Sequence, residues 1–356
     1  MYELILAFLA SLIANLLIIR FKHLHNHLSG DSDLTGPQKF HTKITPRIGG
    51  ISIVIGLSSA ILMKDRSAQD ANIGFILLLC SIPVFSIGLI EDLIKRISIR
   101  MRLLFTAVSA ACVIILLNIQ ITYLAVPFID LLFLIPFFGF TLTVVAITGL
   151  ANAYNIIDGF NGLSSMVGII TLLAIGYMGH VLGDPTITYL SLVMASAILG
   201  FFVWNYPMGL IFLGDGGAYL IGFWVGTLSI LLCHRHPEVS PWFALLINGY
   251  PIMETMFTIY RRGIHQGKSP GQPDGIHFHT LIYKRLLQVK HAESMVTANS
   301  RTAPYLWFLA ILSIIPAILW WQSTPILVLA CLIFIFSYVW VYQRIVKFKT
   351  PSWMHL

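Results

Sequence analysis

The sequence contains few charged residues: they make up 10% of its 356 residues, whereas hydrophobic residues make up 57%. An ordinary soluble domain has roughly 25% charged residues. So little charge excludes a soluble globular protein, because its surface would lack the polar residues that face water. We therefore expect an all-α, polytopic integral membrane protein surrounded by membrane lipids.

Cysteines are also few, and the four lie within or beside apolar runs with no CxxC pair and no partner at metal-ligand spacing. This pattern indicates no zinc site. The net charge is +7, but the basic residues flank apolar runs and form no continuous basic domain, so nucleic acid is not an expected partner. Residues 1–20 lack a basic leading region and a small-residue cleavage site, which favours a first span over a removable signal peptide.

Eleven apolar stretches are about long enough to cross a membrane. The segment 118–150 is the least regular of the chain, because Pro127, Asp130 and Pro136 interrupt it. The expected spans are 3–19, 48–63, 73–90, 103–121, 126–149, 163–181, 187–204, 216–233, 241–259, 303–321 and 324–342.

With eleven spans, all but three of the 22 Lys and Arg residues fall on one side of the membrane; the exceptions are Lys64, Arg66 and Arg235. The positive-inside rule places the basic side in the cytoplasm and the N-terminus in the periplasm. We expect one transmembrane catalytic domain over 1–345 and a cytoplasmic tail over 346–356. Its cytoplasmic loops are expected at 20–47, 91–102, 151–162, 205–216 and 260–302.

Five polar segments fall on the cytoplasmic side: HTKITPRIGG (41–50), IEDLIKRISIRMR (90–102), NAYNIIDGFNGLSS (152–165), NYPMGLIFLGDGGA (205–218) and GQPDGIHFHTLIYKR (271–285). Three of them carry acids at a similar membrane depth, which predicts a cluster of Glu91, Asp92, Asp158 and Asp215. Carboxylate oxygens beside a phosphate are the ligands that Mg²⁺ prefers.

Each segment also has a purely structural interpretation. Residues 152–165 can form a turn whose Asn or Asp caps the following helix, and Glu91 and Asp92 can be an ordinary charge cluster beside Lys95 and Arg96. An aspartate between two glycines at the start of a span, as in FLGDGGA, favours a phosphate or metal site at a helix N-terminus.

His277 and His279 can be two solvated imidazoles, since HxH alone does not identify a metal site. Beside Lys and Arg in a cytoplasmic loop, contact with phosphate is favoured over zinc.

In this order and at these spacings, the five segments resemble the polyprenyl-phosphate N-acetylhexosamine-1-phosphate transferases over roughly residues 1–345. The resemblance implies a multi-pass enzyme of the bacterial inner membrane that transfers the sugar 1-phosphate of a UDP-N-acetylhexosamine to undecaprenyl phosphate. It releases UMP and requires Mg²⁺, with Mn²⁺ as the alternative. The resemblance favours the branch that primes O-antigen or common-antigen synthesis, and a homodimer is one possible assembly.

Site residues follow from the resemblance by position. The catalytic set is Glu91, Asp92, Asp158, Asp215, His277 and His279, of which Asp215 and Asp92 are the metal ligands. The nucleotide-sugar set is Lys43, Asn152, Asn155, Gly159, Phe160, Asn161 and Asn205. Three departures from the family pattern, Glu91, Asn161 and Thr280, stand where relatives have Asp, Asp and His, and they indicate a subgroup distant from the peptidoglycan enzyme.

Two chemical routes are open: direct attack by the lipid phosphate, and a covalent phosphosugar intermediate on an aspartate. Direct attack is preferred, with Asp92 orienting or deprotonating the lipid phosphate, because a metal-bound Asp215 is a poor nucleophile.

A secondary transporter is the competing class of protein. Transporters place their ionisable residues near the membrane midplane, whereas the acids of this chain gather at one membrane face. A catalytically inactive scaffold of the same fold is the third alternative. No feature of the sequence identifies the sugar.

Overall fold

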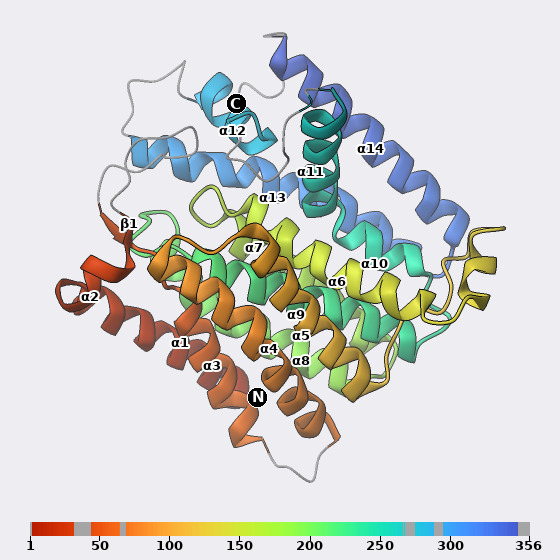
Figure 1. Ribbon diagram of the computed structural model, residues 1–356, viewed down its shortest axis with the longest axis horizontal. Helices are drawn as coiled ribbons and strands as arrows, with labels where there is room; N and C mark the ends of the chain where they lie inside the picture. The colour runs from red at the N-terminus through yellow and green to blue at the C-terminus, as the bar shows by residue number, and fades with distance from the viewer. Residues whose placement is uncertain are drawn as a thin grey trace.

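The computed structural model describes residues 2–31, 44–64, 69–265, 267, 275–287 and 295–347, and most of them are helical (Figure 1). Within these residues, nine helices are long and apolar enough to cross a membrane. They are α1 (Tyr2–Arg20), α4 (Gln69–Ile94), α5 (Ile99–Leu117), α6 (Phe138–Ile157), α7 (Leu163–Val181), α8 (Pro185–Asn205), α9 (Gly214–Arg235), α13 (Met295–Leu319) and α14 (Thr324–Val346). The expected class, an all-helical polytopic membrane protein, is confirmed.

Two further expected spans take a different form. The second is a shorter apolar helix of 14 residues, α3 (Gly50–Met63). The ninth is divided into α10 (Pro241–Ile247) and α11 (Gly249–Ile259), which meet at Asn248. The count of eleven spans and their orientation therefore stay predictions.

The expected span at 126–149 is wrong in its boundaries, because α6 begins only at Phe138 and continues to Ile157. Residues before it form an irregular segment with one short 3-10 helix, η1 (Asp130–Leu134). The Asp130 carboxylate accepts hydrogen bonds from the backbone N–H groups of Leu124 (2.7 Å) and Val126 (3.1 Å), which holds this segment in a turn.

The long polar connections contain short ordered elements. The first holds α2 (Lys22–Ser29) and a two-stranded antiparallel sheet of β1 (Gly30–Asp31) and β2 (Thr45–Pro46), in which Asp31 lies opposite Thr45. The second holds two π-helical turns, η2 (Tyr260–His265) and η3 (Tyr283–Leu287), with α12 (Phe278–Ile282) between them.

Helix α9 lies at the centre of the bundle and packs against both α4 and α6 (Figure 1). Over its most apolar 18 residues, 94% are buried inside the protein. A Cβ atom at Gly88 of α4 would lie only 2.6 Å from the Cα of Gly216, so the two backbones touch at this point. Small residues permit this close approach, which van der Waals packing between helices in a membrane requires.

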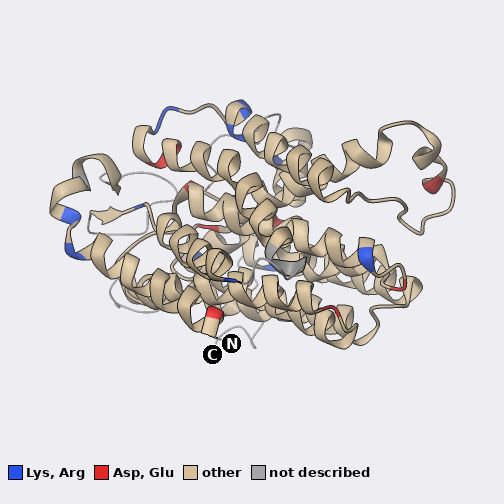
Figure 2. Ribbon diagram, turned by 90° about the horizontal axis from the view of Figure 1, so that it is seen from below, with Lys and Arg blue, Asp and Glu red and all other residues tan. Residues whose placement is uncertain are grey.

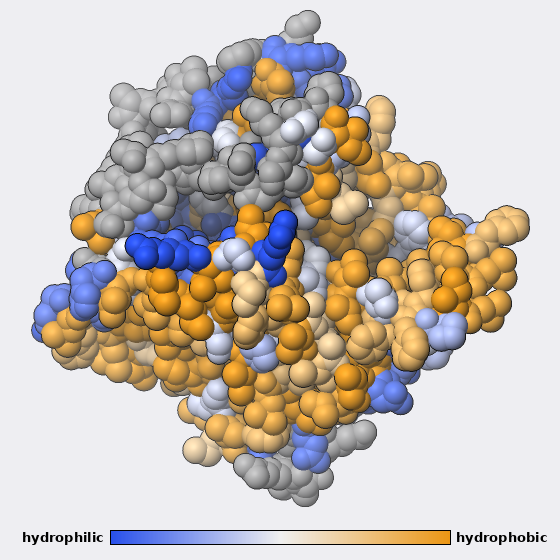
Figure 3. Space-filling view, viewed as in Figure 1, coloured by the Kyte–Doolittle hydropathy of each residue, from blue (hydrophilic) through white to orange (hydrophobic). Residues whose placement is uncertain are grey.

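The outer surface is apolar over most of its area. In Figure 3, hydrophobic residues cover most of the lower and right part of the visible face, while hydrophilic residues gather towards its upper left. Figure 2 shows how sparse the charged residues are along the helices. Large apolar side chains such as Ile115 and Phe336 are exposed, as expected for helices that face lipid.

Candidate active site

The described residues form a cavity of about 610 Å³ where the ends of α4, α5, α6, α9 and α11 meet the segment of α12. Most of the residues predicted for the site line it. They are Glu91, Asn152, Asn155, Asp158, Gly159, Phe160, Asn161, Asn205, Asp215, His277 and His279. Asp92 does not line the described cavity, and Lys43 lies outside the described residues. The binding roles of these residues stay predictions.

The polar face of α6 forms one wall of the cavity. Asn152 and Asn155 lie inside this helix, not in a loop, because α6 continues to Ile157. Residues three positions apart share one helix face, so Asn152 and Asn155 lie on the face of α6 that ends at Asp158. No hydrogen-bond partner for these three side chains is present among the described residues, which leaves them available to a ligand.

The alternative interpretation of this stretch as a helix cap is wrong. Helix α7 begins after Gly162, and no side chain caps it. Gly162 has a φ of +73°, a left-handed conformation that glycine adopts without strain, so the turn depends on this residue.

Asp158 lies just beyond the membrane-spanning part of α6. Burial raises the pKa of its carboxyl to about 7; the positive charge of Arg47 opposes this rise and the negative charge of Asp215 adds to it. In the ligand-free protein, Asp158 therefore changes its charge close to neutral pH, and a bound cation favours its ionised form.

Asp92 stabilises the start of α9. Its Oδ1 and Oδ2 accept hydrogen bonds from the backbone N–H groups of Asp215 (2.8 Å) and Gly216 (3.0 Å). Gly214 has a φ of +78°, and a Cβ atom there would lie 2.5 Å from Asp92 Oδ2, so only glycine permits this contact. The carboxylate thus complements the positive end of the α9 dipole.

This geometry changes the expected role of the acidic pair. Successive residues of a helix point about 100° apart, and the structure turns Glu91 to the cavity and Asp92 to α9. Both oxygens of Asp92 are occupied and its side chain is 1% exposed. These contacts favour a helix-capping role for Asp92 over the expected roles of metal ligand and base for the lipid phosphate.

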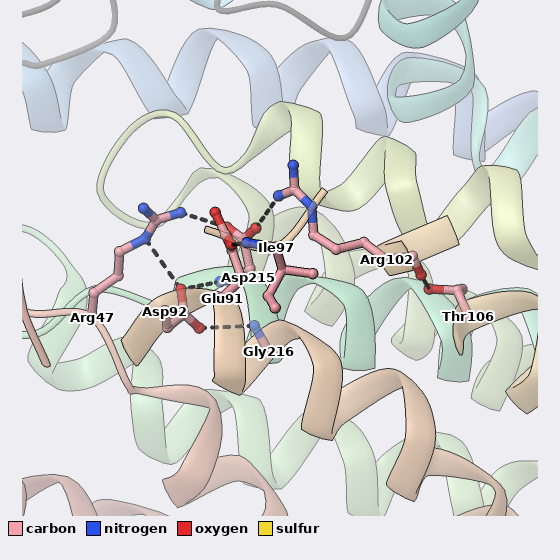
Figure 4. Close-up of polar contacts among 8 residues, drawn as sticks. All are labelled: Arg47, Glu91, Asp92, Ile97, Arg102, Thr106, Asp215 and Gly216. Atoms are coloured by element: carbon pink, nitrogen blue, oxygen red, sulfur yellow. Dashed lines mark hydrogen bonds and ion pairs between the residues drawn. The ribbon is translucent and has the colours of Figure 1, made fainter. Parts of the chain in front are cut away.

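Two arginines reach the Asp215 carboxylate from opposite sides (Figure 4). Arg47 donates to Oδ1 and Arg102 donates to Oδ2 of Asp215, and Arg47 Nε lies 3.3 Å from Asp92 Oδ1. Burial lowers the pKa of Arg47, but the charges of Asp215 and Asp92 outweigh it and raise this pKa above its usual value. The sequence placed both arginines in polar cytoplasmic segments but did not select them as site residues.

Asn161 and Asn205 fix the loops around the cavity. Asn205 accepts a hydrogen bond from the Gly162 N–H (2.6 Å) through its side-chain oxygen and donates one to the Ile211 carbonyl (2.8 Å). The Asn161 amide donates to the Pro207 carbonyl (3.2 Å). These contacts hold the turn before α7 against the loop before α9 and give both residues a structural role, while the expected contact with the nucleotide stays a prediction.

The two histidines also line the cavity. Their rings stack with centroids 5.1 Å apart, and the rings of Phe160 and His279 form a T-shaped contact with centroids 5.5 Å apart. A Cβ atom at Gly159 would lie 2.9 Å from His279 Nε2, so the glycine lets this ring approach the α6 wall. His277 Nδ1 lies 3.0 Å from the buried carboxylate of Glu254, a residue that the sequence placed in a span without a role.

The donor atoms of the cavity fit Mg²⁺. No group of three or more His, Cys, Asp or Glu in the described part of the chain is arranged to hold a metal ion by itself. Mg²⁺ usually needs only one or two protein carboxylates and completes its six ligands with phosphate oxygens and water. Asp158 and Asp215 both line the cavity and are the candidate carboxylates for such a site.

Comparison with known proteins gives one family. A model of glycosyl transferase family 4 matches residues 74–233, which include Glu91, Asp158 and Asp215. A Bacillus subtilis (strain 168) protein named "probable undecaprenyl-phosphate N-acetylglucosaminyl 1-phosphate transferase" is 31% identical over 286 residues, which are 78% of this chain and 77% of the relative.

Two further relatives have similar names. A Thermotoga maritima undecaprenyl-phosphate alpha-N-acetylglucosaminyl 1-phosphate transferase is 28% identical over 71% of this chain and 73% of its own. A Mycolicibacterium smegmatis decaprenyl-phosphate N-acetylglucosaminephosphotransferase is 29% identical over 71% of this chain and 67% of its own. The similarity therefore extends across most of the bundle.

Proposed function

We propose a reaction for this chain from the family to which it belongs, the polyprenyl-phosphate hexosamine-1-phosphate transferases of glycosyl transferase family 4. It transfers N-acetylhexosamine 1-phosphate from a UDP-linked sugar to undecaprenyl phosphate and releases UMP. The observation that carries this proposal is the cavity in which the acids Asp158 and Asp215 lie beside the cations Arg47 and Arg102.

In the preferred direct route, an oxygen of the lipid phosphate attacks the phosphorus that carries the sugar. A new P–O bond forms, the bond from that phosphorus to the bridging oxygen breaks, and UMP leaves with the electron pair. One phosphoanhydride replaces another, so the equilibrium lies near balance. Such transfers depend mainly on positioning and on neutralising phosphate charge.

The charged groups suit these needs. Asp158 and Asp215 would hold Mg²⁺, which when bound neutralises charge on the diphosphate oxygens. Arg47 and Arg102 then turn from Asp215 to phosphate oxygens, since a planar guanidinium binds phosphate as well as carboxylate. His277 and His279 line the same cavity and would contact the same phosphates.

The two substrates approach from different sides. Asn152 and Asn155 offer amide groups to the uridine and its ribose, and Phe160 adds an apolar surface beside them. The cavity is also lined by the apolar side chains of Leu103 and Ile259, which are partly exposed. Apolar side chains at the cavity suit a polyprenyl chain that enters from the bilayer.

The names of the relatives specify N-acetylglucosamine, which favours one donor sugar among the UDP-N-acetylhexosamines. We therefore propose UDP-N-acetylglucosamine as the donor, Mg²⁺ or Mn²⁺ as the cofactor, and the bacterial inner membrane as the location. Priming of O-antigen or another cell-envelope polysaccharide is the corresponding role. The acids of the cavity lie at helix ends, which favours this enzyme over a transporter with a midplane site.

The test is UMP release by the purified protein in detergent with undecaprenyl phosphate and Mg²⁺. A panel of UDP-amino sugars identifies the donor, Asp215→Asn is the inactive control, and omission of the lipid tests the route. We expect release with UDP-N-acetylglucosamine only when lipid is present. One equivalent of UMP without lipid would support the covalent route. No release with any sugar, or equal release by Asp215→Asn, would overturn the proposal.

A further inference from the structure

We propose that Glu254 and Tyr338 are positioning residues that hold His277 with its proton on Nδ1, so that Nε2 accepts the proton of the lipid phosphate. The inference rests on the proposed function and deepens it. It gives a role to the buried carboxylate of Glu254, which the transfer reaction as proposed above does not use.

Three elements bring the groups together. Glu254 lies on α11, His277 directly precedes α12, and Tyr338 lies on α14. Glu254 Oε1 is 3.0 Å from His277 Nδ1, and Glu254 Oε2 accepts a hydrogen bond of 2.8 Å from the Tyr338 hydroxyl. The Phe278 N–H also donates to Oε1, at 3.2 Å. The side chain of Glu254 is 1% exposed, so water does not replace these partners.

The hydrogen bonds fix the tautomer of His277. An ionised carboxylate only accepts hydrogen bonds, and Tyr338 and Phe278 already donate to the carboxylate of Glu254. His277 Nδ1 must therefore carry a proton to bond to it. Thr258 Oγ1 lies 3.3 Å from the same nitrogen, a second and longer contact. With Nδ1 protonated, Nε2 is the basic nitrogen of the neutral ring.

The position of the ring suits proton transfer. His277 lines the cavity while its Nδ1 is held by Glu254, and Nε2 is on the opposite edge of the ring. When the lipid phosphate enters as its monoanion, Nε2 takes its one proton as the new P–O bond forms. The buried charge of Glu254 stabilises the imidazolium that results, and UMP leaves with the electron pair of the broken bond. Atoms and charges balance without a further reactant.

A double-mutant cycle tests this role. Glu254→Gln keeps the shape of the side chain but removes its charge, and we expect kcat about 100-fold lower, the size usual for loss of acid–base catalysis. The KM for the UDP-sugar should stay within about threefold, because the group acts on the proton and not on the donor. In a His277→Gln background, Glu254→Gln should lower kcat by less than about twofold more, because the two residues act as one unit.

Tyr338→Phe gives a second, milder test that preserves volume if Glu254→Gln does not fold. It removes one hydrogen bond to Glu254, and we expect kcat three- to tenfold lower, with no further loss on the His277→Gln background. The matched control is Tyr250→Phe. Tyr250 is fully buried on α11 beside Glu254, and its hydroxyl has no hydrogen-bond partner among the described residues. Its kcat should equal that of the wild type.

The outcomes separate the two proposals. An inactive wild type would refute the proposed function. With an active wild type, rescue of Glu254 by Asp but not by Gln, together with a non-additive cycle, supports the positioning role. Losses that multiply with those of His277→Gln, or a kcat of Glu254→Gln and Tyr338→Phe close to that of the wild type, would overturn it.

Discussion

The substitution Asp92→Asn distinguishes a carboxylate that stabilises a helix start from one that binds metal. In the structure, Asp92 accepts two backbone N–H groups at the start of α9 and lies 3.3 Å from Arg47 Nε. An asparagine has one carbonyl oxygen for the two N–H groups and no charge for Arg47. Loss of one charge-assisted hydrogen bond costs about 1.5–3 kcal/mol, and the weakened ion pair adds to this loss.

The expected result is a clear loss of stability. Thermal unfolding in detergent should show a melting temperature roughly 2–5 °C lower for Asp92→Asn, since the unfolding entropy of a chain of 356 residues gives about 1.3 °C per kcal/mol. The Mg²⁺ concentration for half-maximal activity should stay within about threefold, because Asp92 does not line the described cavity. Glu91→Gln is the matched control. Its carbonyl oxygen can still accept the Ile97 N–H that Glu91 Oε2 accepts at 2.6 Å, so its stability should change little.

One result would refute this reasoning. If Asp92→Asn unfolded at the same temperature as the wild type but needed ten times more Mg²⁺, Asp92 would be a ligand and not a cap.

Three further predictions concern the wall formed by α6 and the turn after it. Gly159→Ala places a Cβ atom 2.9 Å from His279 Nε2. We therefore expect kcat/KM at least about tenfold lower with an unchanged melting temperature. An unchanged kcat/KM would show that the His279 ring moves aside freely. Because burial raises the pKa of Asp158 to about 7 and a bound cation favours its ionised form, the Mg²⁺ concentration for half-maximal activity should rise as pH decreases below 7. Since ionising the buried carboxyl costs free energy, stability without ligand should fall as pH rises from 4 to 7, and Asp158→Asn should reduce that slope. Asn161→Asp removes the hydrogen bond to the Pro207 carbonyl, and we expect the free energy of unfolding to fall by about 1–3 kcal/mol. A gain in activity without loss of stability would instead favour the expected contact of residue 161 with the uracil base of the nucleotide.

The membrane class was predictable from local composition, because long apolar runs define helices in lipid. The cluster of acids was predictable from their shared depth at one membrane face, whereas the asparagines and histidines of the cavity were selected by the resemblance to a known family. The boundary of α6 was missed for a specific reason. Asn152 and Asn155 gave this stretch a loop-like composition, but Ala151 and Tyr154 lie on the other face of the helix and pack against Gly222 of α9.

The pairing of charges was not predictable in the same way. Arg47 and Asp215 are 168 positions apart, and nothing in a single sequence indicates that they meet. Glu91 and Asp92 are adjacent in the sequence, which suggested a shared role, yet the helix turns them to different partners. Glu254 was assigned only a place in a span, since its partners His277 and Tyr338 come from two other elements.

The most direct measurement follows the phosphorus atom that carries the sugar. UDP-N-acetylglucosamine labelled with radioactive phosphorus at that position is incubated with the purified protein, undecaprenyl phosphate and Mg²⁺, and the lipid is extracted. Transfer of the sugar 1-phosphate predicts that the label moves into the lipid and that UMP appears in equal amount, with neither change for Asp215→Asn. Label that stays in UDP while the sugar moves, or that never leaves the donor, would contradict the account.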